Sequence, residues 1–315
     1  MIKIEDGSSN LAKVDVGGIS KQVKPLSIGE LELALLARWP QEDAFDWDNT
    51  GLLVGDPAQT VSGVAVALDP TGDAIEAAAK MGANVLLTHH PVYLDPPPRF
   101  MPSHKLATTP GVNVFTAITN GIALMNFHTA LDVSAEATRL LASMLNLEFE
   151  RVLEPFPTSP EKGLGQVCSV RASDKPFKLS HLAARCTSVF GRAPRVWGDA
   201  TTSVEKLVIA NGSVGETVWS ALDAGITCLI CGEVGYHKAL DASQAGMRII
   251  EVGHDVSEFP LTALLAQAAI DAGISSDRVA IVDQTGKWTV PDSTRICNTT
   301  GSSRVYNGTK RRILA

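Results

Sequence analysis

The chain has 315 residues and a formal net charge of -7, and 45% of its residues are hydrophobic and 19% charged. This composition is ordinary for a globular protein of one or two domains, and the negative balance argues against a surface that generally binds nucleic acid or anionic membranes. No apolar run approaches the ~20 residues that cross a bilayer, and the N-terminus carries Glu5 and Asp6 rather than an apolar signal core. The five cysteines form an odd, scattered set. We therefore expect a reduced, cytoplasmic protein.

Residues 1–24 lack a clear hydrophobic period and are predicted to form an N-terminal extension. A helix is predicted to begin near Ser27, where Glu30 completes a capping box, and to end at Pro40. Beyond it, apolar runs alternate with amphipathic stretches, which favours a parallel or mixed sheet covered by helices. Strands are predicted at about 51–54, 61–68, 85–88 and 122–125, and helices at about 71–81, 105–120 and 134–145.

A second α/β unit is predicted to begin after a proline-containing connector at 155–160. Its strands are predicted at about 165–171, 206–210, 227–231, 248–252 and 279–282, with helices that end near residues 189, 224, 245 and 272. We therefore expect an α/β protein of two lobes with mixed sheets, the first at about 25–155 and the second at about 160–285. Residues 286–315 are predicted to form a polar C-terminal tail.

Two adjacent histidines, His89 and His90, follow the predicted strand at 85–88. Pro91 prevents the strand from continuing, so both imidazoles lie at or just past its carboxyl end, where open α/β sheets bind their ligands. A turn at this point would let both rings serve one site, each holding a different ion of a metal pair. The alternative is a capped strand end with two solvated histidines.

Further candidate ligands follow other predicted strands. They are His128 and Asp132 in the first lobe, and His237, His254 and Glu258 in the second. His254 and Glu258 are four residues apart and share one face if a helix begins there. The mixture of imidazole and carboxylate suits zinc, iron, manganese or cobalt better than calcium or magnesium, and a shared carboxylate would let two ions lie within ~4 Å. The alternative is a set of unconnected polar loop residues.

Five segments together resemble the Nif-three-like dinuclear metal-centre proteins, many of which carry the name GTP cyclohydrolase 1 type 2 homologue. Three match the family's signatures: Thr88-His89-His90-Pro91, His128-Thr129-Ala130-Leu131-Asp132 and Gly253-His254-Asp255-Val256-Ser257-Glu258. The other two are Asp48-Asn49-Thr50-Gly51-Leu52 and Gly232-Glu233-Val234-Gly235-Tyr236-His237, and all five lie in the right order within roughly residues 27–285. The resemblance implies the Nif-three-like fold, in which the two lobes are related and a metal site lies at their interface.

The resemblance also implies the ligands and the assembly. Two divalent ions per chain would be held by His89, His90, Asp132, His254 and Glu258, with Glu258 as the bridge. The chain would form a toroidal homohexamer. We expect self-association, with no membrane or nucleic-acid partner.

The implied function is a metal-dependent hydrolase, with GTP opened at the imidazole ring of guanine as the substrate that the family name gives. A non-catalytic metal-binding or regulatory assembly protein is the alternative. The candidate catalytic residues are His128, which would ligate a metal or hydrogen-bond to the site, and His237, a proton carrier or a helix cap.

Two other motifs leave a choice between function and packing. Cys228 and Cys231 have C-x-x-C spacing but lie in an apolar strand without a second pair, which favours buried structural thiols over a redox or zinc site. The segment Gly212-Ser213-Val214-Gly215 opens a predicted helix. Its backbone N–H groups could cradle a phosphate, or it could form a packing turn.

Overall fold

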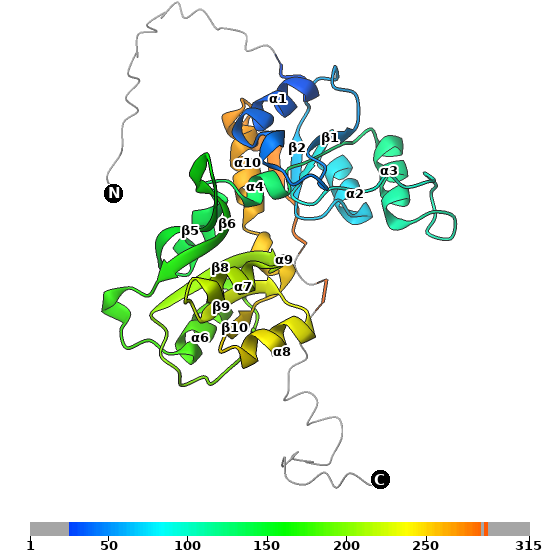
Figure 1. The fold of residues 1–315 in the computed structure, drawn as a ribbon. Coiled ribbons are helices and arrows are strands. Elements are labelled where there is room, and N and C mark those ends of the chain that lie inside the picture. The colour runs from blue at the N-terminus through cyan, green and yellow to red at the C-terminus, as the bar shows by residue number, and fades with distance from the viewer. Residues whose placement is uncertain (1–24, 285–286, 289–315) are drawn as a thin grey trace, which may run out of the picture.

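The computed structural model describes residues 25–284 and 287–288. The predicted N-terminal extension at 1–24 and most of the predicted tail at 286–315 lie outside these residues. Two sheets occupy the upper and lower parts of Figure 1, each with helices against its faces. Both contain parallel and antiparallel pairs, so the prediction of an α/β protein with mixed sheets is confirmed. Within the described part of the chain, no helix is long and apolar enough to span a membrane.

The first sheet has the strand order β1-β4-β3-β2-β11. Its strands are β1 (Gly51–Val54), β2 (Val64–Ala67), β3 (Val85–Thr88), β4 (Ala123–Asn126) and β11 (Val279–Ile281). Strands β2, β3 and β4 run parallel and are buried throughout, because helices cover both faces. One face packs against α1 (Ile28–Arg38) and α10 (Leu261–Asp271), and the other against α2 (Gly72–Lys80) and α3 (Thr109–Asn120).

Local sequence signals set the ends of these helices. The predicted capping box is present at α1: Ser27 Oγ accepts from the N–H of Glu30 at 3.1 Å, and the N–H of Ser27 donates to the Glu30 carboxylate at 2.8 Å. Thr71 caps α2 through its hydroxyl, which accepts from the N–H of Ala74. Only residues 68–71 therefore connect β2 to α2, and this short loop carries one partner of the site.

The second sheet has the strand order β5-β6-β8-β9-β10-β7. Its strands are β5 (Glu148–Phe156), β6 (Ser159–Ser169), β7 (Arg195–Trp197), β8 (Lys206–Ser213), β9 (Cys228–Glu233) and β10 (Arg248–Glu251). One face packs against α5 (Ala137–Met144) and α6 (Leu179–Phe190), and the other against α7 (Thr217–Asp223) and α8 (Tyr236–Gln244). The second sheet thus lies between two helical layers, as the first sheet does.

Short helices complete the fold. Two of them, α4 (Thr129–Asp132) and α9 (His254–Glu258), follow β4 and β10, and three 3₁₀ turns lie at Gln41–Asp43, Ala172–Asp174 and Ser276–Arg278. Figure 1 places α9 at the junction of the two sheets. The carboxyl ends of β3, β4 and β10 therefore meet at this junction.

The boundary between the sheets differs from the predicted lobes at 25–155 and 160–285. Residues 155–160 are not a connector: they lie at the tip of the β5–β6 hairpin, and Pro155 is tolerated because β5 is an edge strand. The second difference is at the C-terminal side. There α10 packs on the first sheet, and β11 pairs in parallel with β2. The chain therefore leaves the first sheet at about residue 145 and returns to it after α9.

The two cysteines of the C-x-x-C segment lie on opposite faces of β9. Cys228 packs in the core beside α6, and Cys231 packs in the core beside α7 and α8. Both are buried free thiols. Neighbours three apart in a strand point to opposite faces, so the pair can neither form a disulfide nor share an ion. This supports the prediction of structural thiols.

Candidate metal centre

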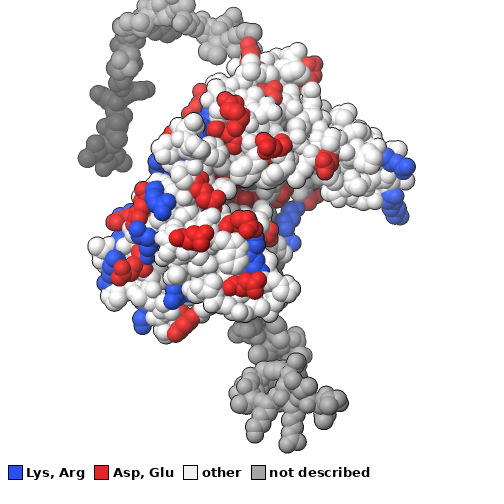
Figure 2. Space-filling model, viewed as in Figure 1, with Lys and Arg blue, Asp and Glu red and all other residues white. Residues whose placement is uncertain are grey.

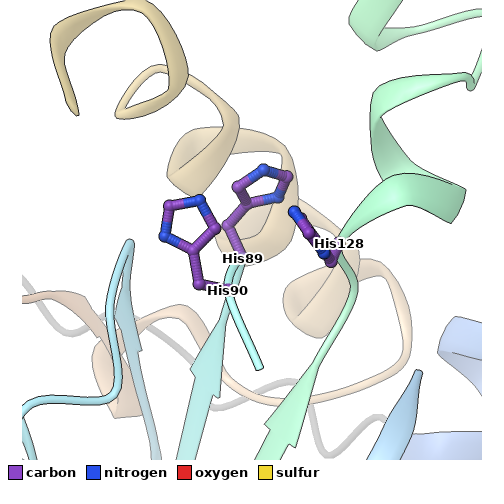
Figure 3. A group of neighbouring side chains, drawn as sticks. All are labelled: His89, His90 and His128. Atoms are coloured by element: carbon purple, nitrogen blue, oxygen red, sulfur yellow. The ribbon is translucent and has the colours of Figure 1, made fainter. Parts of the chain in front are cut away.

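Three histidines meet at the carboxyl ends of β3 and β4. His89 and His90 follow β3 directly, and their ring centroids are 4.9 Å apart. His128 follows β4, and its centroid lies 5.2 Å from that of His89 and 5.4 Å from that of His90. Figure 3 shows the three rings gathered at the strand ends. The chain turns at His90, whose carbonyl accepts a 2.7 Å hydrogen bond from Thr88 Oγ1, so two adjacent residues reach one site.

Glu258 lies in the middle of the cluster and is only 4% exposed. His254, one turn earlier in α9, places its Nε2 2.8 Å from Glu258 Oε2. His90 Nε2 lies 3.0 Å from the same oxygen, so this carboxylate joins the two sheets. The other oxygen, Oε1, lies 3.8 Å from His89 Nε2, and Asp132 Oδ1 lies 3.5 Å from that nitrogen. The two oxygens of Glu258 thus face two sets of side chains.

These donor atoms form two groups that suit a metal ion. His90, His254 and Glu258 form one, and His89, Asp132 and Glu258 form the other; the candidate ligand atoms of each group lie within 4.8 Å of one another. His89 is fully buried, yet its Nε2 has no hydrogen-bond partner among the described residues. A buried polar atom without a partner costs free energy, and a metal ligand bond would remove that cost. The side chains therefore fit the metal-binding role that the sequence predicts.

An oxygen atom orients the ring of each of the three proposed histidine ligands, His89, His90 and His254. The partners of Nδ1 are Phe127 O at 3.1 Å for His89, Asp69 Oδ1 at 2.7 Å for His90 and Glu233 Oε1 at 3.0 Å for His254. Because Nδ1–H donates outward, the neutral ring presents the lone pair of Nε2 to the cluster. Metal-binding histidines in proteins are usually held in this way.

His128 is oriented by a buried carboxylate. Its Nδ1 lies 2.9 Å from Asp48 Oδ1, and Asp48 Oδ2 accepts from the hydroxyl of Thr129 at 2.6 Å and from its N–H at 2.9 Å. Burial raises the pKa of Asp48, but the hydrogen bonds from His128 and Thr129 outweigh it, and the pKa lies below its ordinary value. Asp48 is therefore ionised, and His128 Nε2 is left for another partner. His128 also forms a third possible ligand group with His89 and His90.

Negative charge dominates the centre of the cluster. Burial raises the pKa of Glu258, but the neighbouring imidazoles of His254, His89 and His90 hold it well below the ordinary value. Burial lowers the pKa of His90, and its contacts with Asp69 and Glu258 raise it to a net value of about 10. The hydrogen bond with Glu258 is the main reason that the pKa of His254 is raised to about 9. The ionised carboxylate thus stabilises positive charge around it, as protons or as metal cations.

The carboxyl end of β8 packs closely against the carboxylates. Gly212 has a φ of +58°, and a Cβ at this position would overlap Glu258 Oε1. Its N–H donates to Ser257 Oγ at 2.9 Å. Asn211 donates to Asp132 Oδ1 at 2.6 Å, and burial raises the pKa of Asp132. The close approach of the backbone to Glu258 explains why residue 212 is a glycine. The structure therefore favours the packing turn over a phosphate cradle for this segment.

Two cavities open beside the cluster. The first is about 550 Å³, and its lining includes Asp69, His90 and His254 together with Arg192 and Arg195. The second is about 530 Å³ and reaches the other side of the cluster. Its lining includes the aromatic side chains of Phe45 and Trp47 and the polar side chains of His128, Asp132, His254 and Glu258. The cluster is therefore accessible to small molecules from two sides.

The structure brings all five predicted ligands and His128 into one cluster, but not His237. His237 is exposed in the first turn of α8, where its ring contacts that of Tyr236, and it lines neither cavity. A catalytic role for His237 at this cluster is therefore not supported by its position in this chain.

Sequence reasoning missed the partners that orient the rings. Asp48 and Glu233 lie in two of the segments that resemble the family, and Asp69 lies two residues past the end of β2, the strand next to β3. That last position was a usable signal, because the carboxyl ends of parallel strands meet at one edge of the sheet.

Known proteins resemble this chain over most of its length. A family model described as Duf34/NIF3 (NGG1p interacting factor 3) matches residues 26–280. A Streptomyces coelicolor protein named GTP cyclohydrolase 1 type 2 homolog is 32% identical over 240 residues, which cover 74% of this chain and 82% of that protein. A Helicobacter pylori protein named GTP cyclohydrolase 1 type 2 is 27% identical over 229 residues, covering 72% and 85% of the two chains.

Solved structures share the fold. A Bacillus cereus protein related to NIF3 superposes with a TM-score of 0.76 and 19% identity, covering 85% of this chain and 100% of that one. A Staphylococcus aureus hypothetical protein gives a TM-score of 0.75 and 22% identity over the same shares. These likenesses extend to nearly the whole described part of the chain.

Proposed function

Since the chain belongs to the Duf34/NIF3 family, we propose that it binds two divalent metal ions and acts as a metal-dependent hydrolase on a small-molecule or nucleotide substrate. The observation that carries the proposal is the buried carboxylate of Glu258, which lies between two groups of donor atoms and faces each with a different oxygen. A carboxylate in this position suits a bridge, because its negative charge offsets the repulsion between two nearby cations.

The proposed ligands divide between two ions. His90 and His254 would hold one, His89 and Asp132 the other, and Glu258 would contact both. The imidazole and carboxylate donors favour zinc, iron, manganese or cobalt. Bound ions would supply Lewis acidity, which stabilises negative charge that develops on a substrate and activates water as a nucleophile.

His128 is the proposed proton carrier. Its Nδ1–H is fixed on the ionised carboxylate of Asp48, which leaves Nε2 free to accept a proton and stabilises the ring once it is charged. The ring borders both the cluster and the 530 Å³ cavity, so a substrate there would lie within its reach. Asp48 and Thr129 hold the imidazole in this orientation.

The 530 Å³ cavity is the proposed substrate site. Phe45 and Trp47 offer flat apolar surfaces, and no Lys or Arg is among the described residues that line it, which suits an uncharged planar ring. The two arginines lie in the other cavity, on the far side of the cluster. A nucleotide with its base at Trp47 and its phosphates towards Arg192 and Arg195 would span both, and GTP, named for the Helicobacter relative, is of this class.

The test is turnover by metal-loaded protein. Zinc-, manganese- or iron-loaded protein is incubated with GTP and with p-nitrophenyl phosphate, and products are identified by mass spectrometry. We expect metal-dependent hydrolysis that is lost in His89→Ala. In His128→Gln we expect turnover to fall by ~10²-fold or more, with metal content retained, because a general acid–base contributes about that factor. His181→Gln, an exposed histidine of α6, is the matched control and should retain activity.

The second candidate function is metal binding without catalysis. It is favoured by the ring orientation at every histidine of the cluster, which a storage or regulatory site would need equally. Two bound ions with no turnover of any nucleotide or phosphoester would support it and contradict the hydrolase.

A further inference from the structure

The last residues of the described chain reach the partner of a proposed metal ligand. After β11, the N–H of Val282 donates to Val66 O at 2.7 Å and extends the parallel pairing with β2. Gln284 then lies beyond the end of β2 and is only 8% exposed. Its side chain contacts the loop at 68–71, which carries Asp69. The family match ends at residue 280, so Gln284 lies outside it.

The primary amide of Gln284 holds this loop with both of its ends. Its Oε1 accepts from the N–H of Leu68 at 2.8 Å and of Asp69 at 2.9 Å. Its Nε2 donates to Asp69 O at 2.9 Å. These backbone groups lie past the last ladder pair of β2 on this side, and buried backbone groups need partners. An amide carries its acceptor and its donor on separate atoms, as these three bonds require, and a flipped amide would set its NH₂ against two N–H groups.

Asp69 needs such support because its carboxylate is half exposed. Its side chain keeps 47% of its accessible surface, so packing does not fix it, yet its Oδ1 lies 2.7 Å from His90 Nδ1. Its backbone is held at N–H and at C=O by Gln284. The direction in which Asp69 reaches His90 therefore depends on a residue 215 positions later in the chain.

We infer that Gln284 is a positioning residue for the metal centre: it holds the Asp69 loop so that Asp69 orients His90 towards the ion shared with His254 and Glu258. The inference rests on the proposed function, because it assumes that His90 binds metal. It assigns a role to the segment that follows β11, and it predicts an effect on one ion and not on the other. His89 and Asp132 share no hydrogen bond or ion pair with Gln284 or Asp69 among the described residues.

The test is a double-mutant cycle on metal affinity. Gln284→Met removes the amide at similar volume, and Asp69→Asn removes the carboxylate charge. Cobalt binding is followed by calorimetry and by the visible absorption of the bound ions. Asp69→Asn should weaken one of the two ions by roughly 10–100-fold, as loss of an orienting partner does. Gln284→Met should weaken the same ion by about 10-fold, and the double variant should bind it no more weakly than Asp69→Asn alone.

Lys287→Ala is the matched control, since within the described residues Lys287 makes an exposed ion pair with Asp73 near the same loop and no hydrogen bond to Asp69 or Gln284. It should change neither affinity. A readout without metal is the low-field NMR signal of the His90 Nδ1–H, which should be present in the wild type and lost in Gln284→Met. If Gln284→Met does not fold, Gln284→Asn, which shortens the side chain by one methylene, replaces it.

Three results would overturn the inference. They are unchanged metal affinities in the Gln284 variants, an equal loss of affinity at both ions, or a double variant in which the losses of affinity from the two single substitutions multiply. A wild type that binds fewer than two ions would instead contradict the proposed function. The NMR signal would still decide the role of Gln284 in that case.

Discussion

Gly212 packs against Glu258 so closely that an added Cβ would overlap its carboxylate, and its substitution tests how tightly that carboxylate is placed. Gly212→Ala would push a methyl group into Oε1, so we expect affinity for both ions to fall by at least about 10-fold. Separately, a non-glycine residue in the left-handed region should lower the free energy of unfolding by ~1–3 kcal/mol. Metal titration and thermal unfolding would measure the two effects.

Gly215, three residues later and just past β8, provides the matched control. Its φ is +54°, nearly that of Gly212, but a Cβ there meets nothing within 4 Å. Gly215→Ala should therefore lose stability through backbone strain and keep its metal affinity. Equal metal affinities for the two alanine variants would show that Gly212 is not needed for the approach to Glu258.

The buried thiols should be unreactive in the folded protein. Burial raises the pKa of Cys168, Cys186 and Cys228 to about 12, and it also raises that of Cys231. Thiolate is the reactive form, so at pH 8 almost none is present, and alkylation should speed up only as the pH approaches these values. Mass spectrometry after iodoacetamide treatment should find the four modified in denaturant and unmodified under native conditions. Rapid native labelling of Cys228 would contradict the assignment as core residues.

At the scale of single residues, the sequence predicted the candidate ligands better than the residues that orient them through hydrogen bonds. His89, His90 and Glu258 stand out because a histidine pair at a strand end and a His-x-x-x-Glu spacing have a chemical reason. The residues next to Asp69 in the sequence give no such chemical reason, because the role of Asp69 depends on the parallel pairing of β2 with β3. The sequence places His237 at the site because it follows a predicted strand, but the residue of its segment that reaches the site is Glu233.

At the scale of elements, α10 belongs to the first sheet although the chain reaches it last. Leu265 of α10 is fully buried in the core that covers β2 and β3. Leu265→Ala should lower the free energy of unfolding by ~2–5 kcal/mol, the usual cost of a cavity in a core. Leu33→Ala in α1, where the side chain is 68% exposed, should change it by less than ~0.5 kcal/mol. Denaturant unfolding would measure both, and a small effect at Leu265 would contradict the packing of α10 on this sheet.

The helices and buried strands could be predicted because their signals are local. The capping box at Ser27 and the apolar run at 85–88 each define an element within a few residues. The partition into sheets is not local. Nothing near Val279 indicates that β11 pairs with β2, more than 200 residues earlier, and the prolines near 155–160 resemble a linker as much as a hairpin tip.

At the scale of the molecule, surface charge bears on the proposed partners. Figure 2 shows Asp and Glu side chains over both the upper and lower parts of the visible face, with Lys and Arg mainly over the lower part. Together with the net charge of -7, this supports the proposal that nucleic acid is not a partner. Salt-dependent binding of DNA would contradict it.

We propose that the chain assembles into a homohexamer, as the family resemblance implies. Sedimentation velocity should then give a particle of about six times the 33.3 kDa chain mass, independent of added metal if the ions lie within each chain. A monomer at micromolar concentration would contradict the assembly but not the metal centre.

The central claim is that Glu258 bridges two ions, and the metal content of three proteins tests it directly. The wild type should bind two divalent ions per chain. His90→Ala should mainly lose one, because His90 belongs to a single group of donors.

Glu258→Gln keeps the shape of the side chain but removes the charge that offsets two cations, so it should weaken both ions. Competition with a chromophoric chelator, supported by elemental analysis, gives the stoichiometry and both affinities. Two ions in the wild type, weakened together in Glu258→Gln and singly in His90→Ala, is the predicted result. Near wild-type binding of two ions by Glu258→Gln would contradict the bridge.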